Sequence, residues 1–135
     1  MTIELRNIEG RPAPPNYHHV SIAAGDRLIH IAGQVGTDDS GQVVDGGLAA
    51  QAERAALNVA SALEAAGASP SDLVKLTIYV VGWDQSMLPE LGQGLYAAAG
   101  DNPWPQVPIT LIGVASLFEP GMLIEIEGVA VASAG

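Results

Sequence analysis

The segment from residue 122 to residue 132 alternates apolar side chains with two carboxylates, and it constrains the fold more than any other part of the chain. Successive side chains of a β-strand point to opposite faces, so Glu125 and Glu127 are expected to point the same way. A pair of acids inside an otherwise apolar strand is costly to bury unless other groups satisfy it. We therefore expect the functional site on this strand.

The rest of the chain shows strand and helix patterns. Apolar runs on both sides of Gly25-Asp26 predict a β-hairpin, and an Ala-rich run with helical spacing, stopped by Gly67, predicts a helix. A glycine-rich loop over residues 34–47, with a short strand at 42–44, is expected between them. The expected elements are strands over 20–23 and 27–33, a helix over 48–66, a strand over 72–81, a helix over 83–99, and strands over 109–115 and 122–132.

The expected order β-β-α-β-α-β-β predicts an α+β fold with a mixed sheet. Two helices can cover only one face of this sheet, and alternate residues from Val74 to Val80 are expected to meet them. The other face is apolar enough to need a partner, which predicts an oligomer. We treat residues 1–135 as one domain in which residues 1–16 form an N-terminal arm on the surface.

Composition narrows the possible partners. The net charge is −10, from 5 Lys and Arg against 15 Asp and Glu, and no basic residue follows Lys75. Phosphate backbones and anionic membranes attract clustered cations, so we expect neither a nucleic-acid nor a membrane partner. The absence of cysteine excludes disulfides, thiol catalysis and Cys-ligated metals. No apolar run reaches the roughly 18 residues of a membrane span and no signal peptide is evident, so a cytoplasmic location is expected.

Several short motifs occur in an order and spacing that resemble the RidA/YjgF family of reactive-intermediate deaminases, over roughly residues 17–131. The motifs are Ile31-Ala32-Gly33-Gln34, Gln51 followed by Leu57-Asn58-Val59, the segment 65–80, Tyr96, and the closing segment 124–131. The resemblance implies a chorismate-mutase-like fold and a homotrimer with clefts between subunits. It also implies binding of a small molecule in those clefts and hydrolysis of 2-imino acids without a cofactor or metal.

The same resemblance implies the site residues. It makes Glu125 the catalytic group that orients or activates a water molecule. The substrate-binding residues that it implies are Tyr17, the turn formed by Ala32, Gly33 and Gln34, and Gln93 on the second helix.

One departure concerns the arginine that clamps the substrate carboxylate in this family. The family motif aligns with Val107-Pro108-Ile109-Thr110, which places Ile109 at the arginine position and Thr110 after it. A charge-assisted hydrogen bond to a carboxylate contributes about 1.5–3 kcal/mol. We therefore expect weak or no activity on ordinary 2-imino acids.

Other side chains have more than one possible role. Trp104 lies in a proline-rich loop before the 109–115 strand, where it could form a wall of the cleft. Three histidines can form a metal site, but the adjacent His18 and His19 are expected on opposite faces, and His30 lies on another strand. A surface or core role is favoured over zinc, and His18 or His19 could replace the missing arginine contact.

Two functions remain open at this stage. The first is a metal-free hydrolase or deaminase acting on an imine, an enamine or a related reactive intermediate. The second is a non-catalytic module of the same fold that binds a metabolite or a partner protein. Ribonuclease activity, which has also been attached to the family, is disfavoured by the net charge of −10.

Overall fold

A computed structural model describes residues 2–133 of the chain. Strands and helices follow one another in the order β1, β2, β3, α1, β4, α2, β5, β6, with short 3-10 helices before β4 and α2. Their bounds are β1 (Thr2–Arg6), β2 (Val20–Ala24), β3 (Arg27–Val35), α1 (Gly47–Ala65), η1 (Pro70–Asp72), β4 (Leu73–Val81), η2 (Gln85–Met87), α2 (Leu88–Ala99), β5 (Ile109–Val114) and β6 (Ile124–Ala132).

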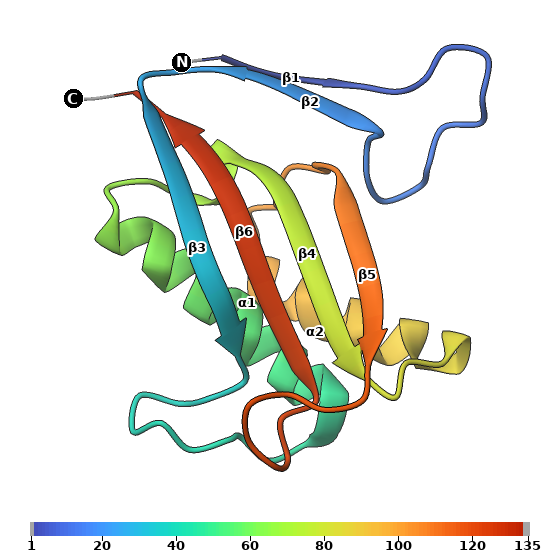
Figure 1. The fold of residues 1–135 in the computed structure, drawn as a ribbon, viewed down its shortest axis with the longest axis vertical. Helices are drawn as coiled ribbons and strands as arrows, with labels where there is room; N and C mark the ends of the chain where they lie inside the picture. Colours follow the sequence, from blue (N-terminus) through green and yellow to red (C-terminus); the bar gives the residue numbers. More distant parts are fainter. Residues whose placement is uncertain (1, 134–135) are drawn as a thin grey trace.

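The main sheet has four strands in the order β3-β6-β4-β5, so the carboxylate-bearing strand β6 lies inside it (Figure 1). β6 is antiparallel to both β3 and β4, whereas β5 runs parallel to β4. This arrangement confirms the predicted mixed sheet. The register places Glu127 opposite Thr77 and Glu125 opposite Tyr79, which brings both acids beside the polar face of β4.

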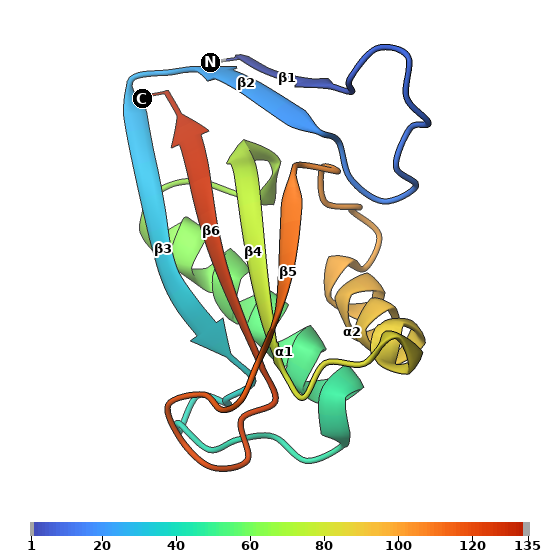
Figure 2. The same cartoon turned by 45° about the vertical axis from the view of Figure 1, so that its right-hand side comes forward.

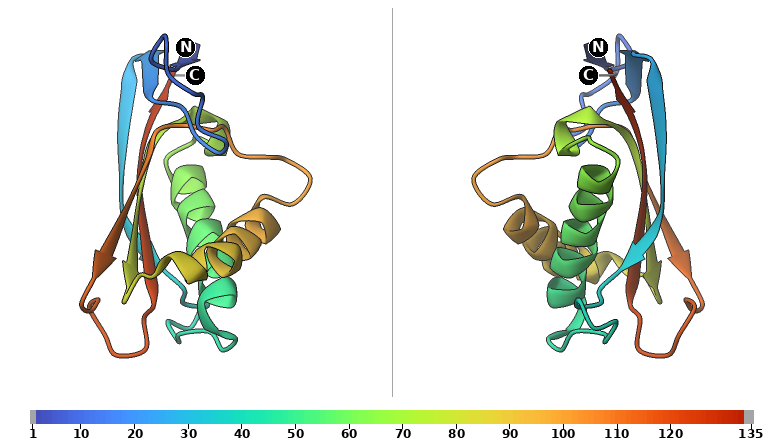
Figure 3. Two further views of the ribbon diagram at one scale, coloured as in Figure 1. Left: turned by 90° about the vertical axis from the view of Figure 1, so that its right-hand side faces the viewer. Right: turned by 90° about the vertical axis from the view of Figure 1, so that its left-hand side faces the viewer.

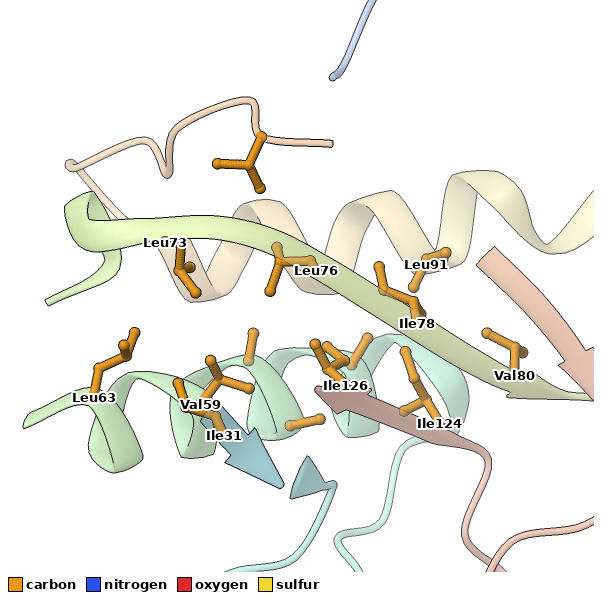
Figure 4. Packing of buried hydrophobic residues seen from close by; sticks show 14 of the residues in the cluster. Ile31, Val59, Leu63, Leu73, Leu76, Ile78, Val80, Leu91, Ile124 and Ile126 are labelled. Carbon is orange, nitrogen blue, oxygen red and sulfur yellow. The ribbon is translucent and has the colours of Figure 1, made fainter. Parts of the chain in front are cut away.

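Both helices cover the same face of this sheet and leave the other face open, as the side views show (Figure 3). Between the layers lies a core of aliphatic side chains from β3, β4, β6 and α1, to which α2 adds Leu91 next to Ile78 (Figure 4). Alanines of α1 such as Ala52 and Ala55 are fully buried, and their small size lets the helix lie close to the sheet. The Ala-rich pattern therefore predicted the helix and most of its buried face, but not the burial of the polar Gln51.

The N-terminal region differs from the sequence-based prediction. The predicted hairpin between residues 20–23 and 27–33 is wrong, because β2 pairs with β1 and β3 pairs with β6. Part of the expected arm is thus strand β1, and the β1–β2 ribbon projects beyond one end of the main sheet (Figure 1). Ile3 and Leu5 of β1 are half-buried, and Leu5 packs against the core, which connects the ribbon to the rest of the domain.

Smaller differences have local causes. The helix predicted from residue 83 begins as η2, capped by Asp84, and becomes α-helical only at Leu88, with Pro89 in its first turn. Residues 42–44 form no strand among the described elements, and Val43 makes one isolated bridge to Thr37. A register shift near the start of β4 buries Leu73 in the core in place of Val74.

The packing of α2 on α1 depends on one glycine. Figure 2 shows the two helices crossing on the covered side of the sheet. A Cβ atom added to Gly94 would lie 2.3 Å from the backbone oxygen of Ala49 and 2.8 Å from Cβ of Ala52. The neighbouring Gly92 has no other atom within 4 Å of such a Cβ.

These two glycines give a matched stability test. We expect Gly94→Ala to lower the free energy of unfolding by about 1–3 kcal/mol, because the added methyl group forces the helices apart. Gly92→Ala should raise it by about 0.5–1 kcal/mol, because alanine loses less backbone entropy in a helix. Urea unfolding of both variants measures the difference, and equal effects would contradict the close helix packing.

Candidate functional site

The site is built around a contact between the end of β3 and the start of β6. The pairing of these strands is irregular between Ile31 and Gln34, so the chain bulges at Ala32 and Gly33. A Cβ atom at Gly33 would lie 2.4 Å from Cδ of Glu125, so only glycine lets this carboxyl group lie against the β3 backbone. The structure thus brings together Gly33 and Glu125, two residues that the family resemblance implied.

Gln34 and Ala32 complete this part of the site. The side-chain amide of Gln34 donates from Nε2 to the backbone oxygen of Ala32 at 3.0 Å, which braces the bulge from within. Ala32 is exposed and Glu125 is half-buried, so the bulge and the carboxylate form a surface that a small molecule can reach. A carboxylate beside a strand backbone can accept a proton from a water molecule or orient it.

Polar side chains of α1 fix the segments that lead into this contact. Gln51 is only 4% exposed, and its amide donates to the oxygen of Gly121 at 2.9 Å and accepts from the N–H of Leu123 at 2.8 Å. These bonds hold the turn from which β6 begins. Asn58, two turns further along α1, donates to the backbone oxygens of Val35 and Thr37 at 2.9 Å each and holds the end of β3.

The open face of the sheet continues from Glu125 as a row of polar pairs. The hydroxyl of Tyr79 on β4 donates to Oε1 of Glu127 on β6. This hydrogen bond is the main reason why the pKa of Tyr79 is raised above its usual value, with desolvation adding to it. One step along the sheet, Nζ of Lys75 donates to Oγ1 of Thr110 at 2.5 Å.

A second group of predicted residues lies away from Glu125. The Tyr17 ring packs edge-on against the ring of His19, with centroids 6.3 Å apart. The neighbouring His18 hydrogen-bonds through Nδ1 to the backbone oxygen of Gln106 at 2.7 Å, which ties this loop to the segment before β5. Trp104 of the same segment packs partly buried against the core.

Two further predicted residues face the helix side. Ile109 pairs with Leu76 and packs against the core, whereas Glu125 pairs with Tyr79 on the opposite face. Three residues of strand separate the two pairings, or about 10 Å. Gln93 is exposed on α2, on the covered side of the sheet. One chain therefore gathers Ala32, Gly33, Gln34 and Glu125, while Tyr17, Trp104, Ile109 and Gln93 lie elsewhere.

No group of three His, Asp or Glu side chains within residues 2–133 is arranged to hold a metal ion. The histidines have separate surroundings: His18 bonds to Gln106, Nδ1 of His19 accepts from the N–H of Ile8 at 3.0 Å, and His30 lies exposed on β3.

Among the helices of residues 2–133, none is long and apolar enough to cross a membrane.

The sequence interpretation missed the two cross-strand pairs. Because it expected alternate residues from Val74 to Val80 to meet the helices, it left Lys75 and Tyr79 on the other sheet face. It did not connect Lys75 with Thr110 or Tyr79 with Glu127. These partners lie 35 and 48 residues apart in the chain, and only the register of three strands brings them together. Their shared strand face was the available signal, since cross-strand neighbours on one face interact.

The Gln51 contact can be tested by removing its amide. Gln51→Met keeps the side chain's length but leaves a buried N–H and a buried C=O unsatisfied, so we expect the free energy of unfolding to fall by roughly 2–4 kcal/mol. Amide hydrogen exchange at Leu123 should accelerate more than exchange in the centre of β4. Gln42→Met, at an exposed loop position, serves as the control, and an equal loss of stability there would refute this role.

The Tyr79–Glu127 hydrogen bond can be tested by titrating the Tyr79 hydroxyl. Glu127→Gln should lower the pKa of Tyr79 toward its ordinary value of 10.0, measured by tyrosinate absorbance in a Tyr17→Phe, Tyr96→Phe background. Because the folded-state pKa is the higher one, this interaction stabilises the fold fully below about pH 10 and is lost as pH rises through the folded pKa. Glu119→Gln in an exposed turn is the control and should leave the titration unchanged.

Comparisons with known proteins agree with this architecture. The family model described as Endoribonuclease L-PSP matches residues 9–132. A RutC family protein of Pyrococcus horikoshii is 30% identical over 123 residues, which cover 90% of this chain and 92% of that protein. The human 2-iminobutanoate/2-iminopropanoate deaminase is 46% identical over 54 residues, but this match covers only 39% of each chain.

Solved structures extend the likeness to the whole fold. A protein of unknown function from Yersinia pestis, assigned to the conserved Rid protein family, superposes with a TM-score of 0.84 at 34% identity. That match covers 98% of this chain and 100% of the other. A member of the YjgF/YER057c/UK114 family from Mycobacterium tuberculosis gives a TM-score of 0.62 at 27% identity over 97% of this chain and 100% of that chain. The chain therefore belongs to the RidA/YjgF family and has its α+β, chorismate-mutase-like fold.

Proposed function

We propose that this protein is a cytoplasmic, metal-free and cofactor-free hydrolase that deaminates a small imine, enamine or related reactive intermediate. The observation that carries the proposal is the Glu125 carboxyl group, seated against the backbone of Gly33 at the edge of an accessible surface. The name of the human relative, 2-iminobutanoate/2-iminopropanoate deaminase, supports this reaction class. The short extent of that match leaves the substrate itself as part of the proposal.

The chemistry requires one group that handles protons next to a bound water molecule. In the proposed reaction the Glu125 carboxylate takes a proton from water as the water oxygen bonds to the imine carbon. Glu125 then gives this proton to the imine nitrogen, which yields a neutral carbinolamine. In the second step Glu125 takes the carbinolamine hydroxyl proton and passes it to the nitrogen, and the C–N bond breaks as the C=O bond forms, which releases ammonia. The products are the oxo compound and ammonia, so one water molecule is consumed per imine and no oxidant is needed.

We further propose that the complete site forms between subunits of a homotrimer. Within one chain the loop of Tyr17 is tied to the segment before β5, whereas Glu125 lies three residues further along the sheet, opposite Tyr79, so a second copy would have to supply the other wall of the cleft. The open sheet face supports such an association, because Leu28 is 66% exposed and Ile112 is 40% exposed on it. Large exposed apolar side chains on one face are typical of interaction surfaces.

The missing arginine sets the expected substrate range. No lysine or arginine follows Lys75, and the residue aligned with the family arginine, Ile109, faces the core. The proposed enzyme therefore lacks the bidentate donor that suits a carboxylate. This supports an imine or enamine substrate that does not depend on such a clamp, with weak or no turnover of ordinary 2-imino acids.

The test measures hydrolysis of 2-iminobutanoate and of an uncharged imine of similar size, each generated in situ. We expect Glu125→Gln to lower the rate on the better substrate at least about 100-fold, as loss of a general base does. Circular dichroism should show an unchanged fold. Glu119→Gln, a carboxylate in the exposed turn before β6, should leave the rate unchanged.

Other outcomes would favour different functions. Turnover of 2-iminobutanoate at the rate of arginine-bearing relatives would contradict the proposed substrate range. Full activity in Glu125→Gln would remove Glu125 from the reaction. If no imine is hydrolysed but a metabolite binds saturably, the protein is a non-catalytic binding module, which the scattered positions of the predicted residues within one chain would also fit.

A further inference from the structure

The loop that connects β1 with β2 is closed at its base by a histidine side chain. Residues 7–19 form this loop, and its two ends lie just beyond the last residue pair of the β1–β2 ribbon (Figure 1). The backbone N–H of His19 donates to Oδ1 of Asn7 at 3.0 Å, and the N–H of Ile8 donates to Nδ1 of His19 at 3.0 Å. These two hydrogen bonds hold the start and the end of the loop together.

A second pair of contacts holds the loop against the segment before β5. Nδ1 of His18 bonds to the backbone oxygen of Gln106 at 2.7 Å, and Nε2 of Gln106 donates to the oxygen of Pro15 at 3.5 Å. Tyr17 lies in the chain between Pro15 and His18, and its ring packs edge-on against the ring of His19. The position of Tyr17 therefore depends on both sets of contacts.

The two adjacent histidines carry their ring protons on different nitrogens. A backbone N–H can only donate, so Nδ1 of His19 presents its lone pair to Ile8, and the ring proton lies on Nε2. A backbone oxygen can only accept, so Nδ1 of His18 carries a proton that points to Gln106. The hydrogen-bond partners thus assign opposite tautomers to the two rings.

Protonation has opposite effects on these two contacts. The charge of histidine ordinarily changes between about pH 5 and 8, and both ring nitrogens of the charged form are donors. A charged His18 still donates to Gln106, and more strongly, because the bond becomes charge-assisted. A charged His19 directs an N–H at the N–H of Ile8, so this bond is lost. The bond to Ile8 therefore closes the loop at neutral pH and is lost as the pH falls.

The groups around His19 do not offset a positive charge on its ring. From the start of the loop, a side-chain amide and a backbone N–H contact this residue, and Tyr17 contacts it from the end. His18 is the adjacent titratable group, and Arg6 and Glu9 are the nearest charged side chains along the first half of the loop. Among residues 2–133, no salt bridge involves His19.

We propose that His19 is a proton-sensitive latch that positions Tyr17. Near neutral pH its unprotonated Nδ1 holds Ile8, and the loop is closed. In mild acid the ring releases Ile8 and Tyr17, while His18 keeps the loop attached to the segment before β5. A local protonation thus changes the position of one aromatic side chain without unfolding the domain. The role of Tyr17 at the site rests on the proposed function, but the latch itself does not.

NMR of the ¹⁵N-labelled, unmodified protein tests the latch. At about pH 8 we expect the ring nitrogen shifts to show the Nε2–H tautomer for His19 and the Nδ1–H tautomer for His18. On titration to about pH 5, the Ile8 amide signal should shift together with the His19 ring signals, and the Overhauser contacts between the Tyr17 and His19 rings should be lost. An Nδ1–H tautomer for His19, or an Ile8 amide signal that ignores its protonation, would overturn the proposal.

A substitution that keeps the acceptor but removes the titration provides a rescue test. His19→Asn offers a side-chain oxygen to the N–H of Ile8, and an amide oxygen takes up no proton in this pH range. We expect the Ile8 signal to stop responding to pH in this variant. His30→Asn, at an exposed position on β3, is the matched control and should keep the full response. A response that persists in His19→Asn would assign the effect to another group and refute the latch. The titration of the unmodified protein needs no variant, so it decides the question even if a variant fails to fold.

These measurements separate the latch from the proposed hydrolase, because they involve no imine. Spectra without the latch, combined with hydrolysis that depends on Glu125, would contradict the latch alone. A working latch combined with full activity in Glu125→Gln would contradict the proposed function alone.

Discussion

The amide of Gln51 is the contact on which the candidate site depends most directly. Among the described residues, Gln51 is the polar residue whose side chain is buried. Its amide nitrogen donates to the backbone and its amide oxygen accepts from the backbone, in both cases just before β6. The helix can hold it there because α1 lies so close to the end of β3 that a Cβ atom on Gly36 would come within 2.7 Å of Cα of Gln51. The start of β6 is thereby fixed, and with it the register that sets Glu125 opposite Tyr79.

The two faces of β6 lie in different environments. On the covered face, Ile124 and Ile126 fill the core, where removal from water stabilises the fold. On the open face the strand carries two carboxylates whose desolvation must be offset. Neutral partners provide part of this compensation, since Glu127 accepts a hydrogen bond from Tyr79. This hydrogen bond also joins β4 to β6 across the open face.

Periodicity in the sequence was enough to predict α1, the strands of the main sheet and the helix-covered face, since each has a long and regular apolar pattern. It could not predict that β2 pairs with β1, because alternation shows that a segment is a strand and says nothing about its partner. The same limit applies to the site. The meeting of Gly33 with Glu125 followed from the family resemblance, whereas the partners of Lys75 and Glu127 depend on a three-strand register that no local pattern encodes.

The positions of Glu125 and Tyr17 connect the proposed reaction with the association of copies. Glu125 and Gly33 meet within one chain, but the loop of Tyr17 is tied to the segment before β5 and lies away from them. A reaction that needs both groups would therefore need a second copy of the chain. Catalysis at Glu125 would then depend on association of copies, so dissociation of the proposed homotrimer would abolish it without unfolding the chain.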